Sequence, residues 1–259
     1  MKNKSIIYLL IIGILLILTN SCQKDRNVIQ DPPTYVDKRF NPIIFNSKLT
    51  YGTMKDIDSN VYKTINIGTQ TWMAENLKVT HYRNNDSIPN VTNNSGWFYL
   101  STGAYCNFEN NLNYVPIYGR LYNYYSVVDA RKLCPTGWHI PADTEWTKLI
   151  SYLGGESVAG GKLKEIGSIH WDYSDTTATN ETGFTALPGH FRMYNGGFEL
   201  YQNILGGWTF GEWGAWWSSS VNVLYNWNVI YLQIDSSSPG AYITDDDKRF
   251  GCSVRCVMD

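Results

Sequence analysis

The sequence predicts an α+β fold with small antiparallel sheets, two or three helices and long loops. The run Val61–Ile67 alternates with a period of two and ends at Gly68, which is typical of a half-buried strand. A clear amphipathic helix begins after Pro141, and the chain from Phe184 to the end consists of strands and loops. Together, these observations indicate one mixed domain.

The N-terminus is typical of an export signal. Lys2 and Lys4 precede an apolar run, Ile6–Leu18, which is too short to cross a bilayer because a mature spanning helix needs about 20 apolar residues. A small residue directly before Cys22 resembles the lipobox, in which a bacterial cysteine is acylated. We therefore expect residues 1–21 to be a lipoprotein signal peptide and Cys22 to be the lipid anchor. An ordinary secretory signal with an incidental thiol is the alternative.

Residues 22–49 contain two adjacent prolines and little periodic apolar pattern, so we expect a lipidated N-terminus followed by a flexible tether. Gln23–Asp25 resembles the short polar signal that sends some Bacteroidetes lipoproteins to the cell surface. The expected location is the cell envelope, with the protein lipid-anchored in the outer membrane and exposed at the surface. The membrane is then a partner through the lipid anchor.

The composition of the whole sequence, with 15% aromatic residues and a net charge of -2, fits a chain that carries one domain with a sizeable core. Nucleic acid is not expected as a partner, because no basic cluster is present to release counterions from phosphates.

The cysteines indicate disulfides. Without Cys22 an even set remains in an exported chain, which favours pairing; the set comprises Cys106, Cys134, Cys252 and Cys256. Spacing alone leaves all three connectivities open. A zinc site is not expected, since the sequence has no Cys-x-x-Cys pair and no clustered histidines.

The helix after Pro141 has clear start and stop signals. Asp143 or Thr144 can cap its free amides, and Gly154–Gly155 supplies a left-handed stop. One apolar stripe follows helical spacing and comprises Trp146, Leu149, Ile150 and Leu153. We expect this helix to pack on a core.

Other elements are expected from weaker patterns. Gln70–Met73 is predicted to be the hairpin return of the first strand, and two further helices are predicted over residues 121–132 and 158–166. The alternating run Ser253–Val257 predicts a strand that pairs inside a sheet.

Several segments, in this order along the chain, follow one shared pattern: Ile67–Leu77, Tyr118–Asn123, Leu133–Pro141, Glu145–Trp146, Asn180–Gly189, Trp216–Ser219 and Ser253–Val257. Together they resemble the Fibrobacter succinogenes major paralogous domain, over about residues 50–259. This family occurs in many exported and lipid-anchored proteins of Bacteroidetes and Fibrobacteres.

The resemblance implies a fold related to C-type lectin-like domains, and Ile140–Trp146 also looks like the helix entry of formylglycine-generating-enzyme-like domains. In the lectin-like fold a disulfide ties the first long helix region to the last strand, which implies a Cys134–Cys256 bridge here. Cys106 and Cys252 would form the remaining pair. The family brings no settled activity.

The tract Gly206–Trp217 is the candidate ligand region, because it carries four tryptophans with glycines between them. Indole faces beside polar groups suit a sugar or aromatic ligand. Trp216 and Trp217 are better explained as core residues. The candidate ligand-binding residues are therefore Trp208, Trp213, Tyr225 and Trp227.

Metal and catalytic signals are weak. Asp245, Asp246 and Asp247 could contribute oxygen ligands to calcium, although a solvated turn is the simpler interpretation. No other cofactor is expected. The histidines and serines form no recognisable nucleophile motif, and His139 is expected to be a packed structural residue.

The sequence therefore predicts a cell-envelope lipoprotein with a lectin-like domain that binds a glycan, peptide or partner protein without catalysis. Two alternatives stay open. One is a structural or adhesion component of an envelope assembly, and the other is a carbohydrate-active or protein-modifying enzyme.

Overall fold

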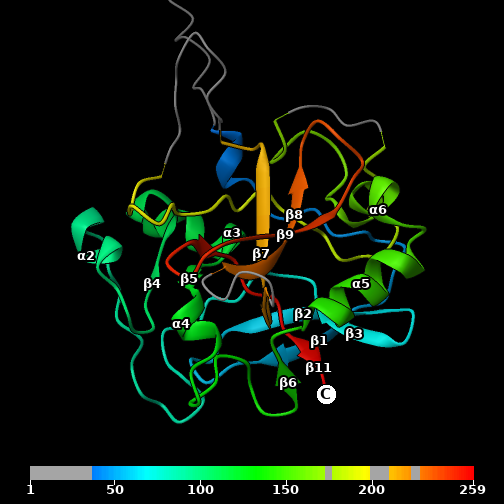
Figure 1. The fold of residues 1–259 in the computed structure, drawn as a ribbon. Coiled ribbons are helices and arrows are strands. Elements are labelled where there is room, and N and C mark those ends of the chain that lie inside the picture. The colour runs from blue at the N-terminus through cyan, green and yellow to red at the C-terminus, as the bar shows by residue number, and fades with distance from the viewer. Residues whose placement is uncertain (1–36, 173–176, 199–209, 223–227) are drawn as a thin grey trace, which may run out of the picture. The chain divides into compact units, whose positions relative to one another are not determined.

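A computed structural model describes residues 37–172, 177–198, 210–222 and 228–259 of the chain. In these ranges, short helices lie around three small antiparallel sheets, as Figure 1 shows. The predicted α+β fold is confirmed.

The largest sheet has five strands in the order β1-β2-β3-β11-β6. The predicted hairpin is confirmed, because β2 pairs with β3 from Thr64 opposite Met73 to Ile67 opposite Gln70. The predicted C-terminal strand is shorter and later than expected, but it does pair inside the sheet, between β3 and β6. The strands are β1 (Gly52–Lys55), β2 (Val61–Ile67), β3 (Gln70–Met73), β6 (Trp138–His139) and β11 (Val257–Met258).

A second sheet has the order β10-β5-β4, with β4 at Tyr105–Cys106, β5 at Leu121–Asn123 and β10 at Gly251–Cys252. The predicted helix over residues 121–132 is wrong, since β5 is followed by only one helical turn, α4 (Tyr124–Val127). The Asn123 side chain accepts hydrogen bonds from the N–H groups of both Ser126 and Ala104, so it caps α4 and also fixes the loop before β4.

The third sheet, β7-β8-β9, has apolar side chains on both faces. Trp217 lies opposite Tyr231 in one core cluster, and Trp216 lies opposite Leu232 in another. Successive residues of a strand point to opposite faces, so β7 supplies one tryptophan to each cluster. The strands are β7 (Trp213–Val221), β8 (Asn228–Asp235) and β9 (Tyr242–Asp247).

The helix expected after Pro141 is α5 (Asp143–Tyr152), and its whole predicted stripe is buried. Its N-cap is Ala142 rather than Asp143 or Thr144, and the Glu145 carboxylate accepts from the Ala142 N–H at 2.9 Å. At the other end, Gly154 and Gly155 adopt positive φ angles, as a left-handed stop requires.

The helix predicted over residues 158–166 is α6, which covers Glu156–Leu163. Among the described residues, no helix is long and apolar enough to cross a membrane. The other helical segments are α2 (Asn94–Phe98), α3 (Val115–Tyr118), η1 (Lys38–Phe40), η2 (Phe108–Asn110) and η3 (Leu112–Tyr114).

The last part of the predicted tether is packed rather than flexible. The compact unit begins at Asp37, and the Ile44 N–H donates to the buried Glu165 carboxylate at 2.6 Å. The ring of Phe40 stacks on Tyr114 with 5.1 Å between centroids. The boundary predicted at residue 49 is therefore too late, while residues 22–36 lie outside the described part of the chain.

A buried polar network joins distant segments of the domain. The fully buried Arg255 donates from Nε to the Asn76 side-chain oxygen at 2.8 Å, and from its other nitrogens to the carbonyls of Phe184 and Thr185. The indole N–H of Trp216 donates to the same Asn76 oxygen at 2.8 Å. Burial lowers the pKa of Arg255 to about 9.

Asn76 extends this network through its amide nitrogen, which donates to the carbonyl of Tyr118 at 2.8 Å and to the hydroxyl of Ser253 at 3.1 Å. The ring of Phe184 lies 4.1 Å from the Arg255 guanidinium, in cation–π contact. Two side chains thus connect five segments that the sequence separates widely.

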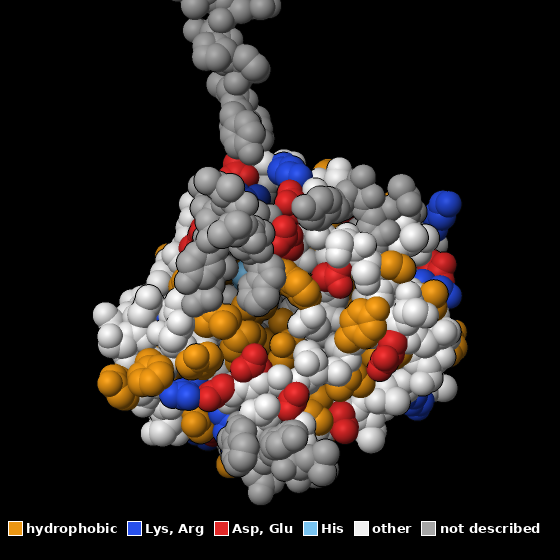
Figure 2. All heavy atoms as spheres, turned by 45° about the horizontal axis from the view of Figure 1, so that its top comes forward, with side chains coloured by type: hydrophobic (Ala, Val, Ile, Leu, Met, Phe, Trp, Pro, Cys, Tyr) orange, Lys and Arg blue, Asp and Glu red, His pale blue; other side chains and the backbone are white. Residues whose placement is uncertain are grey.

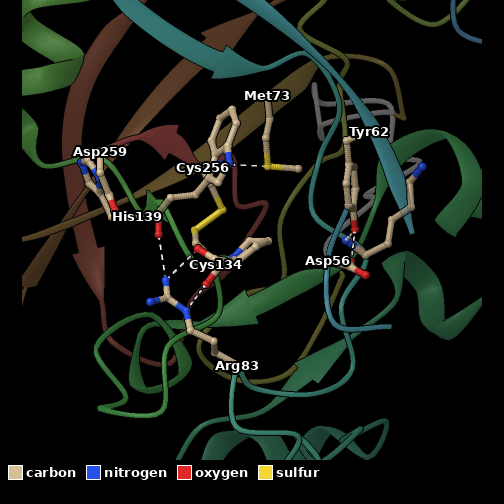
Figure 3. Close-up of a disulfide and its surroundings, with 11 residues drawn as sticks. Asp56, Tyr62, Met73, Arg83, Cys134, His139, Cys256 and Asp259 are labelled. Carbon is tan, nitrogen blue, oxygen red and sulfur yellow. Dashed lines mark hydrogen bonds and ion pairs between the residues drawn. A yellow bond between two sulfur atoms is a disulfide. The ribbon is translucent and has the colours of Figure 1, made fainter. Parts of the chain in front are cut away.

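The disulfide between Cys134 and Cys256 is confirmed and ties the loop before β6 to the residue before β11 (Figure 3). The second predicted pair is wrong, because Cys106 and Cys252 are both buried free thiols. Cys106 lies in β4 and Cys252 in β10, and β5 separates these strands. Two strand spacings of about 4.8 Å exceed the Cα separation that a disulfide spans.

Replacing both Cys134 and Cys256 by Ala lowers the free energy of unfolding by roughly 4–5 kcal/mol, because the bridge closes a loop across 122 residues in the unfolded chain. Urea denaturation measures the loss. The wild-type protein under reducing conditions is the control and should show the same loss. A change below about 1 kcal/mol in both samples would contradict this role.

Candidate functional site

The candidate site is a groove along one face of the third sheet, between Trp213 at the start of β7 and Asp246 near the end of β9. Trp213 is the first residue of β7 and is half-buried, so part of its indole remains accessible. The neighbouring wall is an extended segment that pairs with β10 through two backbone hydrogen bonds between Arg192 and Gly251, each 2.8 Å long. This pairing places Phe191 and Met193 beside the sheet.

The groove has a volume of about 90 Å³ and combines aromatic and polar walls. The rings of Phe191 and Phe250 stack with centroids 4.8 Å apart, and Tyr231 lies 6.0 Å from Phe250. Two polar side chains, Gln233 and Asp246, complete the lining together with Met193 and Trp213. The groove is therefore mainly apolar, with a carboxylate and an amide at its edge.

Asp246 is the titratable carboxyl group in this lining. Burial raises its pKa most strongly, and the N–H of Asp247, which donates to it at 2.7 Å, works in the opposite direction. Repulsion from the carboxylates of Asp245 and Asp247 raises the pKa further. The result is a carboxyl group whose charge is less stable than that of an exposed aspartate.

The predicted ligand residues have different outcomes. Trp213 lines the groove, as the ligand hypothesis requires. Trp208, Tyr225 and Trp227 lie outside the described residues, as does the predicted lipidation site Cys22. The interpretation of Trp216 and Trp217 as core residues is confirmed, because both are fully buried.

The three aspartates proposed as calcium ligands do not form a solvated turn and do not converge. They lie in β9, where successive side chains point to opposite faces. Asp245 accepts hydrogen bonds from Asn222 and Asn228, whereas Asp247 forms an ion pair with Arg249 at 2.6 Å. Within the described ranges, no group of His, Cys, Asp and Glu is arranged to hold a metal ion.

The sequence predicted that His139 is a packed structural residue. This prediction is wrong, because 41% of the His139 side chain is exposed. It lies between two carboxylates, with Nε2 2.9 Å from Glu145 and Nδ1 2.7 Å from Asp259. Burial disfavours its charged form, but the hydrogen bonds to Asp259 and Glu145 outweigh this effect and raise the pKa of His139.

His139 lines a second cavity, of about 280 Å³, beside the disulfide. Arg83, another lining residue, donates to the carbonyls of Cys134, Pro135 and Trp138 at 2.8–2.9 Å. Its guanidinium therefore fixes the loop before β6 through these hydrogen bonds. This role of Arg83 was not predicted from the sequence. We interpret this cavity and its charged groups as structural supports for β6 and β11.

In the comparison with known families, residues 65–258 match the Fibrobacter succinogenes major domain. The chain belongs to this family. Searches among curated proteins and solved structures found no match. The part of the chain that matches the Fibrobacter succinogenes major domain contains the Asn76–Arg255 network, the disulfide and the Trp213 groove. The domain predicted from the sequence begins at residue 50, before the matched range. It therefore includes β1, which is a strand of the five-stranded sheet.

The raised pKa of His139 makes the stability of the domain depend on pH. The folded state binds the proton more tightly, so the contribution is complete below the unfolded pKa of about 6.5 and is lost as the pH rises through the folded pKa. Replacing Glu145 by Gln and Asp259 by Asn together should remove this contribution. Denaturant unfolding at a series of pH values from mildly acidic to alkaline measures it.

The matched control replaces Asp86 and Asp129 by Asn, which removes two carboxylates from Arg131 instead of from a histidine. Arginine keeps its charge throughout this pH range, so the control should leave the pH dependence unchanged. If the Glu145→Gln/Asp259→Asn variant keeps the full pH dependence of the wild-type free energy of unfolding, His139 is not the source of that dependence.

Proposed function

We propose that the protein is a lipid-anchored binding protein of the cell envelope that holds a glycan, peptide or partner protein at the Trp213 groove and performs no catalysis. Lipidation at Cys22, with residues 22–36 as the tether, would keep the domain at the outer membrane. The observation that carries the proposal is the half-buried Trp213 beside the polar groups of Gln233 and Asp246.

This arrangement supports binding for a physical reason. An accessible aromatic face contributes apolar contact area at a low entropic cost, and neighbouring polar groups orient a ligand through hydrogen bonds. The tyrosine hydroxyl of Tyr231 lies 3.4 Å from the Gln233 side-chain oxygen, so the amide nitrogen of Gln233 can be directed at a ligand. A relationship to C-type lectin-like domains fits this proposal and forms part of it.

A structural or adhesion role remains the alternative, in which the same face packs permanently against another envelope protein. The two roles differ in reversibility. A purified binding protein takes up its ligand saturably, whereas a structural component co-purifies with its partner.

Replacing Trp213 by Ala is expected to weaken ligand binding at least tenfold, because the variant loses the aromatic contact that the groove offers. Arrays of glycans and envelope-derived peptides, probed with the purified protein, measure binding. Tyr152→Ala is the matched control, since this residue also exposes an aromatic side chain (65% exposed) but lies on α5 rather than in the groove.

Binding that survives in the Trp213 variant, or that falls equally in the Tyr152 variant, would contradict the assignment of the site. Circular dichroism of both variants checks that the fold is intact.

A further inference from the structure

The Trp213 groove has a combination of walls that distinguishes it from a general apolar pocket. Three aromatic rings besides Trp213 line it, and one carboxylate, Asp246, lies among them. The faces of aromatic rings carry partial negative charge, so they attract cations that lie within about 6 Å of the ring centroid. The aromatic rings and the carboxylate therefore favour the same kind of ligand group.

Asp246 has no cationic partner within the described part of the chain. Its side chain accepts a hydrogen bond from the Asp247 N–H, and the charged groups that act on it, Asp245 and Asp247, are both acidic. Its neighbours are partnered: Asp247 forms an ion pair with Arg249, and Asp245 accepts from two asparagine amides. A half-buried carboxylate without a counter-ion is costly, and a bound cation would offset that cost.

The size of the groove limits what can enter it. Its volume is about 90 Å³. Pockets for drug-sized ligands measure roughly 300–1,000 Å³. The groove thus has room for the tip of a side chain.

The surroundings have the matching charge. Figure 2 turns the top of Figure 1 toward the viewer and shows hydrophobic side chains near the centre of this face, with several acidic side chains and a smaller number of Lys and Arg side chains around them. Asp235, which lies opposite Trp213 in the β7–β8 pairing, adds a carboxylate near the groove. Such a field attracts a positively charged group as it approaches.

We propose that the groove binds the primary alkylammonium group of a lysine side chain on a partner protein, with the ammonium at Asp246 and its methylene chain against Trp213 and Phe250. This inference rests on the proposed function, in which the Trp213 groove is the binding site, and it names the chemistry of the group that the groove accepts.

The test uses the full chain in an uncharged detergent, with tryptophans replaced by 5-fluorotryptophan. The fluorine signal of Trp213 is assigned from its loss in Trp213→Phe. Two probes of similar shape are titrated, Nα-acetyl-lysine methylamide and Nα-acetyl-norleucine methylamide, which lacks the charge. We expect the lysine probe to shift the Trp213 signal saturably, at concentrations at least tenfold lower than the norleucine probe needs.

Two variants of β9 locate the charge that matters. Asp246→Asn should weaken binding of the lysine probe about tenfold, because it removes the carboxylate beside the rings. Asp245→Asn is the matched control, since it makes the same change of charge one residue away on the opposite face of the strand, and it should change the affinity less than twofold.

Equal responses to both probes, an unchanged affinity in Asp246→Asn, or no shift of the Trp213 signal with the lysine probe would each overturn the inference. The proposed function would survive these outcomes if array binding by the wild-type protein is still lost in Trp213→Ala. If array binding is unaffected in that variant, the proposed function fails as well.

Discussion

The hydrogen bond from Arg255 to Asn76 is the constraint on which the rest of this structure depends. Much of the chain runs through loops, whose carbonyls need donors wherever they are buried. Arg255 supplies such donors to Phe184 and Thr185, and Asn76 accepts from both Arg255 and Trp216. The guanidinium is charged and fully buried, so losing its acceptors is costly and the network holds the surrounding segments in one arrangement.

The same use of arginine explains how the groove is built. Arg192 is fully buried and donates to loop carbonyls of Gly196 and Thr92 while its guanidinium lies 4.4 Å from the ring of Trp97. In an extended segment, the two neighbours of such a residue point the other way, and here Phe191 and Met193 line the groove. Anchoring one side chain in the core thus presents the next two to a ligand.

The parts of the fold that sequence predicted correctly are those with local signals. The period of two gave the β2–β3 hairpin, and helical spacing gave α5. The helix expected over residues 121–132 is wrong because Leu121–Asn123 pairs as a strand with β4 and β10, and no local pattern reveals these partners. Of the groove, only Trp213 was predicted, since Phe191, Asp246 and Phe250 meet through the pairing of distant strands.

The most direct test of the central claim is a double-mutant cycle on Asn76→Ala and Arg255→Met, measured by urea denaturation. If the two side chains act as one network, Asn76→Ala lowers the free energy of unfolding less in the Arg255→Met variant than in the wild type. In the wild type, Asn76→Ala leaves the buried guanidinium without an acceptor, whereas Arg255→Met has already removed that guanidinium. The predicted coupling free energy is about 1–3 kcal/mol. Additive effects, within about 0.5 kcal/mol, would contradict the account.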